Sequence, residues 1–60
     1  MNLADEYAID TWPEPKRTMA AILLSNLAHD LFCWPGLWAD IIADTRVALE
    51  ALRDTTDVLA

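Results

Sequence analysis

The stretch FCWPGLW, residues 32–38, decides how this chain folds, because it places a proline and the only glycine between two long, apolar-patterned segments. A residue before proline is biased out of the helical region, so Trp34 should end one helix, and Pro35 and Gly36 suit a turn or the first turn of the next helix. Such a short connection forces the flanking helices into an antiparallel hairpin. The bulky side chains around the turn would then close the end of the hairpin core: Leu31, Phe32, Leu37 and Trp38.

The tryptophans have a second interpretation as anchors for a partner. Tryptophan is enriched among the hot spots of protein interfaces. In this alternative Trp34 stays partly exposed, and so does Trp12 near the other proline break. Trp38 falls on the core stripe of the following helix and fits the anchor interpretation least.

Apolar residues on both sides of the turn recur with helical spacing. The preceding helix is predicted to start near Pro15, a residue type favoured in the first turn, and its core face follows the i, i+3, i+4, i+7 pattern. This face consists of Ala20, Leu23, Leu24, Leu27, Ala28, Leu31 and Phe32. The following helix is predicted from about Leu37 to the mid-fifties, with a core stripe of Trp38, Ile41, Ile42, Thr45, Ala48, Leu49, Leu52 and Leu59.

The N-terminal residues predict one more short helix. Asn2 is a suitable N-cap, and the two prolines of TWPEPKR, residues 11–17, end the helix because each removes an amide donor. Its apolar residues are Leu3, Tyr7 and Ile9. The predicted fold is therefore all-α: a short N-terminal helix plus an antiparallel helical hairpin, arranged as a small three-helix bundle in a single domain that spans residues 1–60.

The chain is short and apolar, with 60 residues of which 55% are hydrophobic, and it has one cysteine. A domain of this size buries only about 60% of the surface of its unfolded chain, and the sequence offers neither a disulfide nor a His and Cys cluster to reinforce it. We therefore expect it to associate, as a homodimer or with another subunit. No run reaches the roughly 20 apolar residues of a membrane span, and the lone thiol and the acidic start favour a cytoplasmic protein.

Ten acidic and four basic side chains give the chain a net charge of −6. Residues 1–15 alone carry four acids and no base. Because nucleic-acid binders cluster Lys and Arg against phosphate, direct binding of DNA or RNA is not expected. Arg46 and Arg53 offset part of the charge through i, i+4 pairs predicted with Glu50 and Asp57.

The acids predict a binding surface for a basic protein. Rows of carboxylates on one helix can imitate a phosphate backbone and occupy a groove that normally attracts nucleic acid. The predicted partner-binding residues are nine acids and one apolar anchor: Asp5, Glu6, Asp10, Glu14, Asp40, Asp44, Glu50, Asp54, Asp57 and Trp34. The alternative is a solvated face that keeps an apolar little protein soluble.

Catalysis has few candidate groups. His29 and Cys33 lie four residues apart and share a helix face, as a Cys-His nucleophile pair or a two-ligand metal site would require, while Asp30 points about 100° away around the helix. A nucleophile also needs an oxyanion site and a pocket, for which a helical hairpin offers little room. We therefore expect no enzyme activity, no catalytic residue, no metal and no cofactor. A simpler interpretation is a partly exposed face that another subunit can cover: Ile22, Asn26, His29 and Cys33.

In length, acidity and compact helical pattern the chain resembles the small proteins that phages encode to disable host defences, including anti-CRISPR proteins, several of which act as DNA mimics. The resemblance covers the whole chain in general character and carries over no functional residue. It implies a non-enzymatic inhibitor in the host cell cytoplasm that occupies the basic site of a nucleic-acid-binding protein or complex, such as a Cas effector. The alternative is a small helical assembly module that forms a homodimer or a subunit of a larger complex.

Overall fold

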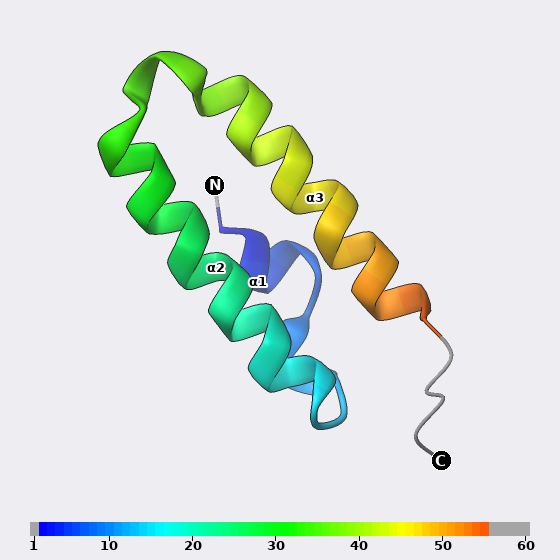
Figure 1. Ribbon diagram of the computed structural model, residues 1–60. Coiled ribbons are helices and arrows are strands. Elements are labelled where there is room, and N and C mark those ends of the chain that lie inside the picture. Colours follow the sequence, from blue (N-terminus) through cyan, green and yellow to red (C-terminus); the bar gives the residue numbers. More distant parts are fainter. Residues whose placement is uncertain (1, 56–60) are drawn as a thin grey trace.

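The computed structural model describes residues 2–55, and this part of the chain contains helices and no β-strand, which confirms the all-α prediction. Three α-helices and two short 3-10 helices follow one another (Figure 1): α1 (Leu3–Glu6), η1 (Ile9–Thr11), α2 (Lys16–Cys33), η2 (Pro35–Leu37) and α3 (Trp38–Asp54). None of the helices in residues 2–55 is long and apolar enough to cross a membrane.

The prolines set the bounds of α2 as the sequence predicts. The helix begins directly after Pro15 and ends at Cys33, because the next residue, Trp34, precedes a proline and has φ −132° and ψ 63°, outside the helical region. The Trp34 amide still donates to the Asp30 carbonyl at 2.8 Å, which completes the last turn. One 3-10 turn then leads directly into α3.

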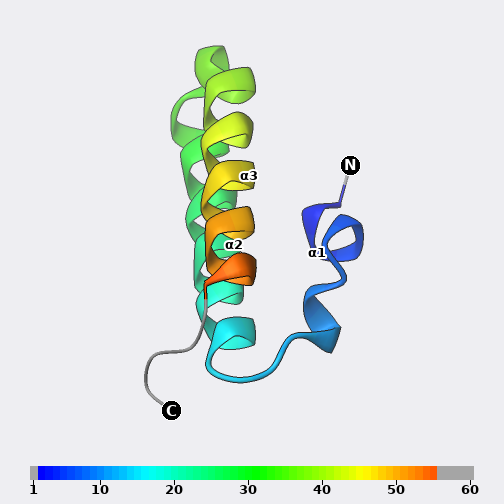
Figure 2. The same cartoon turned by 90° about the vertical axis from the view of Figure 1, so that its right-hand side faces the viewer.

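The two long helices lie side by side, and α3 runs back along α2 from the η2 turn (Figure 1). We call α2 and α3 the helical pair. The N-terminal segment, residues 2–15, lies against one side of this pair, as Figure 2 shows. No other described residue covers the opposite side, which we call the open face.

The N-terminal segment is less helical than predicted, because α1 is a single turn. Asn2 caps it as expected: its side-chain oxygen accepts from the Ala4 amide at 3.0 Å and from the Asp5 amide at 3.4 Å. Ala8 then adopts the left-handed conformation with φ 49° and begins η1. This bend turns the chain so that both Leu3 and Ile9 face the helical pair and are buried.

The core lies where the N-terminal segment meets the helical pair. Six buried residues form it: Leu3, Ile9, Trp12, Ala20, Leu27 and Leu49. The interpretation of Trp12 as an exposed anchor is wrong, since this side chain is only 8% exposed. Its indole Nε1 donates to the Tyr7 carbonyl at 2.9 Å, so the segment folds around the ring. The tryptophan nearest the N-terminus therefore attaches the N-terminal segment to the two long helices.

The residues predicted for the core face are buried or partly buried in the middle of the helices but exposed at the end near η2. Leu23, Leu24 and Leu31 are partly buried against the core, but Ala28 is exposed and Phe32 is 86% exposed. The prediction that these two residues belong to the core is wrong. The reason is coverage, because the N-terminal segment lies away from the η2 turn and leaves that end of α2 without a third layer (Figure 2). Leu59, predicted on the α3 stripe, lies outside the described residues.

Candidate functional site

Four large apolar side chains are exposed together where α2 turns into α3. Their exposed fractions are 86% for Phe32, 59% for Trp34, 48% for Leu37 and 54% for Trp38. We call these four residues the aromatic corner. The prediction that Phe32, Leu37 and Trp38 close the hairpin core is wrong, and so is the placement of Trp38 inside the core stripe. Leu31, the fourth residue of that prediction, is partly buried against the core. For Trp34 the structure instead has the exposure that the anchor interpretation requires.

The backbone holds the aromatic corner in one shape. The Leu37 amide donates to the Trp34 carbonyl at 2.9 Å and closes the 3-10 turn. Across that turn the Trp38 indole Nε1 donates to the Leu31 carbonyl at 3.1 Å, which fixes the ring while leaving half of it in solvent. A surface whose aromatic side chains are already ordered loses less conformational entropy when it binds. These two hydrogen bonds order the turn and the Trp38 ring before any partner binds.

Two carboxylates stand next to the aromatic corner on the first turns of α3. Asp40 and Asp44 are exposed, and neither side chain makes an ion pair or hydrogen bond with any residue in the range 2–55. Four residues of helix separate them by about 6 Å along the axis. Among the predicted acids within Trp38–Asp54, these two are the ones whose side chains face solvent without a cation beside them.

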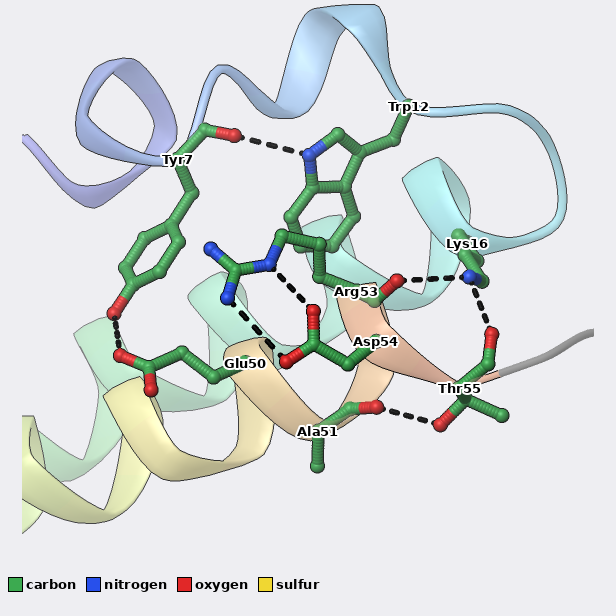
Figure 3. Close-up of polar contacts among 8 residues, drawn as sticks. All are labelled: Tyr7, Trp12, Lys16, Glu50, Ala51, Arg53, Asp54 and Thr55. Atoms are coloured by element: carbon green, nitrogen blue, oxygen red, sulfur yellow. Dashed lines mark hydrogen bonds and ion pairs between the residues drawn. The ribbon is translucent and has the colours of Figure 1, made fainter.

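The other predicted acids on α3 are used inside the molecule. Glu50 accepts a hydrogen bond from the Tyr7 hydroxyl at 2.6 Å, and Asp54 pairs with Arg53 at 2.9 Å (Figure 3). The Arg53 guanidinium also lies 5.8 Å from the centre of the Tyr7 ring. These contacts attach the N-terminal segment to the end of α3. Asp57, and with it the predicted Arg53–Asp57 pair, lies outside the described residues.

Lys16 completes this polar cluster from the start of α2. Its ammonium donates to the Arg53 carbonyl at 3.0 Å and to the Thr55 carbonyl at 2.6 Å (Figure 3). Carbonyls at a helix C-terminus lack intrahelical donors and carry partial negative charge, so a cation stabilises them there. The cluster is structural, because each of its charged groups contacts another part of the same chain.

The acids of the N-terminal segment divide in the same way. Glu6 forms an ion pair with Arg46 on α3, and Glu14 pairs with Arg17 at 2.8 Å. Glu14 also accepts from the Thr18 amide at 3.1 Å and so satisfies an amide in the first turn of α2. The remaining two acids, Asp5 and Asp10, are exposed and have no ion-pair or hydrogen-bond partner for their side chains among residues 2–55.

These contacts shift several pKa values. The hydrogen bond to Glu50 is the main cause that raises the pKa of Tyr7. The hydrogen bond from Arg53 holds the pKa of Asp54 below its usual range. The Thr18 hydroxyl, followed by Arg17, lowers the pKa of Glu14. In each case the shift favours the protonation state that the contact needs.

His29 and Cys33 share a helix face as the spacing predicts. The Cys33 sulfur lies 3.7 Å from Nε2 and 3.9 Å from Nδ1 of His29, and Oδ1 of Asp30 lies 3.8 Å from the same Nδ1, closer than the predicted 100° separation suggests. All three side chains are on the surface rather than in a pocket, and the imidazole is 75% exposed. Within residues 2–55 no group of three or more His, Cys, Asp or Glu side chains is arranged to hold a metal ion.

The open face carries a hollow of about 320 Å³ between α2 and α3. Its lining is apolar and consists of Met19, Ile22, Leu23 and Leu52. The exposed face predicted from the sequence includes Ile22 but not Met19. An apolar surface on this helix could have been predicted from the stretch TMAAILLSNLA, residues 18–28, because it contains no ionisable residue in a chain with a charge of −6.

Comparisons with known proteins give no further assignment. No protein family, no curated protein and no solved structure matches this chain. The function is therefore inferred from the residues described above.

Proposed function

We propose that this protein is a non-enzymatic inhibitor that binds the basic site of a nucleic-acid-binding protein through the aromatic corner and the two carboxylates beside it. One observation supports the proposal above all. Three aromatic side chains and Leu37 are exposed together on an ordered turn, next to Asp40 and Asp44, which have no cation beside them in the described part of the chain.

The aromatic corner supplies the short-range part of the binding energy. Aromatic side chains bury a large area with few rotatable bonds, and they dominate the energetics of protein interfaces when a partner covers them. Monomeric proteins seldom leave several such side chains in contact with water at one place. The groove that receives the corner is therefore apolar at its centre.

The acids supply orientation and a fast encounter. A charge of −6 on 60 residues attracts a basic surface over distances of about one Debye length, roughly 8 to 10 Å at physiological salt. Carboxylates at the rim of an interface contribute mainly to the association rate and to specificity. Asp40 and Asp44 form the near rim, while Asp5 and Asp10 add to the field from the N-terminal segment. Glu6, Glu14, Glu50 and Asp54 stabilise the fold, so their contribution to binding is smaller.

The proposed inhibitor is a small three-helix bundle that works in the cytoplasm. In solution the antiparallel helical hairpin and the N-terminal segment form a small three-helix bundle, in which the segment supplies one turn of helix. A lone exposed thiol at Cys33 fits the reducing cytoplasm, and the likeness to anti-CRISPR proteins suggests a host cell in which a Cas effector is the partner.

A capture experiment with matched variants tests the proposal. The immobilised protein is mixed with host lysate, and bound protein is eluted in one arm with rising salt and in another with duplex DNA. We expect a basic nucleic-acid-binding protein that both arms displace. The double change Phe32→Ser with Trp34→Ser should abolish its capture, and Asp40→Lys with Asp44→Lys should weaken it by at least about tenfold.

The control is Val47→Ser, since Val47 is 68% exposed on α3 and lies outside both the aromatic corner and the acidic rim. This variant should capture as much partner as the unchanged protein. A partner that resists both salt and DNA, or that binds the charge-reversed variant equally well, contradicts the proposed basic site. A partner retained by the Phe32 and Trp34 variant contradicts the role of the corner.

The open face favours a second candidate function, a small helical assembly module. An apolar hollow between two helices is a surface that another protein chain can fill. The two candidates use different residues, because none of the residues that line the hollow belongs to the aromatic corner or is one of the exposed acids, so each can be varied separately.

A further inference from the structure

Helix α2 is apolar on two sides, and residues 2–55 cover only one of them. Ala20 and Leu27 face the core and are buried, while Met19 and Ile22 lie on the other side and are 48% and 56% exposed. A helix that is apolar all round is normally buried all round. The N-terminal segment covers one side of the helical pair only (Figure 2), so the open face is a packing surface without its second half in the described chain.

The residues that line the hollow carry no charge. Residues 18–28 of α2 carry no ionisable side chain. The exposed acids without partners are on α3 and in the N-terminal segment, and none of them lines the hollow. Two chains with a charge of −6 each repel one another, and an interface free of acids keeps that repulsion at its weakest.

We propose that the open face binds a second copy of this chain in a two-fold symmetric dimer, with α2 of each copy against α2 of the other. In such an interface the same patch serves both partners, so it has to offer a projection and a matching hollow at once. Ile22 and Met19 project beside the hollow that they line together with Leu23 and Leu52. The Ile22 side chain of each copy fills the hollow of the other.

The size of the open face fits a dimer of low affinity. The 18 residues of α2 span about 27 Å, and two helices packed 8 to 10 Å apart form a layer roughly 20 Å wide, so each copy buries about 500 Å². The total of about 1,000 Å² is at the lower limit for a specific interface. We therefore expect a weak dimer whose population depends on protein concentration.

The chemistry of the hollow also favours a protein chain over a small molecule. Sites for small molecules place a few polar groups among apolar ones to orient the ligand. The four residues that line this hollow have only aliphatic and thioether side chains. Aliphatic side chains from an identical helix match that lining.

This inference rests on the second candidate function, the assembly module, and is independent of the aromatic corner. The test is sedimentation equilibrium of the whole chain from about 1 μM to about 1 mM, because an interface of this size is expected to be weak. The unchanged protein should pass from monomer to dimer. Ile22→Glu should remain monomeric across the range, which corresponds to a loss of at least about 100-fold in dimer affinity, and Met19→Ala should weaken the dimer by about tenfold.

Val47→Glu is the matched control, because it adds the same charge at a position 68% exposed and away from the hollow. It should dimerise like the unchanged protein, and far-UV circular dichroism should give equal helix content for all variants. A protein that is monomeric throughout overturns the inference. So does a dimer that Ile22→Glu leaves intact, or one that Phe32→Ser dissociates. Because Ile22→Glu leaves the aromatic corner unchanged, this variant should still capture the basic partner. If the unchanged protein is a monomer but captures a different protein through Ile22, the homodimer is overturned while the assembly function is kept.

Discussion

Replacing Trp12 should destabilise this protein far more than replacing Trp34 of the aromatic corner. Trp12 is 8% exposed and Trp34 is 59% exposed. With about 200 Å² per tryptophan and 25 cal/mol per Å² of apolar surface, burial contributes about 5 kcal/mol for Trp12 and about 2 kcal/mol for Trp34, both as upper bounds. Trp12→Ala also removes the donor to the Tyr7 carbonyl, which costs about 1 kcal/mol more.

A chain of this length seldom has more than about 3 to 5 kcal/mol of stability. We therefore expect Trp12→Ala to be largely unfolded at 25 °C, and Trp12→Phe, which loses the indole donor and part of the ring, to lose about 2 kcal/mol. Trp34→Ala should lose less than about 2 kcal/mol and remain folded.

The assay is urea denaturation of the three variants followed by far-UV circular dichroism, with the slope m compared as well as the midpoint. The Trp12 variants should have lower midpoints than Trp34→Ala. Equal losses for Trp12→Ala and Trp34→Ala would refute the reasoning, since the predicted order depends on the Trp12 ring being buried and hydrogen-bonded while the Trp34 ring is exposed.

Three further outcomes follow from single contacts. Tyr7 is the only tyrosine, so an ultraviolet titration follows this one hydroxyl, and its pKa should fall when Glu50→Gln weakens the acceptor. Because the pKa of Tyr7 is raised in the folded protein, the contribution of this hydrogen bond to stability is present below the ordinary value of 10.0 and is lost as pH rises through the raised pKa. The pKa of Glu14 is lowered, so its contribution is present above the ordinary 4.5 and is lost as pH falls through the lowered pKa; thermal melts of Glu14→Gln should lack this part of the acid dependence. Leu49→Ala, at a fully buried position, should lower the free energy of unfolding by about 2 to 5 kcal/mol in urea titrations, whereas Val47→Ala should change it by less than about 0.5 kcal/mol.

Much of the helical pattern could be predicted from local chemistry. Asn2 caps α1, and the residues next to Pro15 and Pro35 bound α2, because capping and the steric limits of proline act within a few residues. The centre of the core, with Leu27 and Leu49, followed from helical periodicity. The common helix face of His29 and Cys33 followed from it too.

The acidic side chains of α3 could be read from the sequence, but their surroundings could not. The sequence predicted these acids and Trp34 as binding residues, yet it could not separate the exposed Asp40 and Asp44 from Glu50 and Asp54, which have partners in the fold. That separation depends on where Tyr7 and Arg53 lie (Figure 3), and therefore on how the N-terminal segment packs.

The sequence by itself determined that this chain is helical, where α2 begins and ends, and that its charge is strongly negative. Only the tertiary structure decided which tryptophan is buried, which acids are used inside the fold and which side of α2 stays open. The physical reason is that helix formation depends on neighbours a few residues away, whereas exposure depends on what covers a surface. Here a one-turn helix and a bend at Ala8 cover one side of the helical pair and leave Phe32, Trp34 and Ile22 in water.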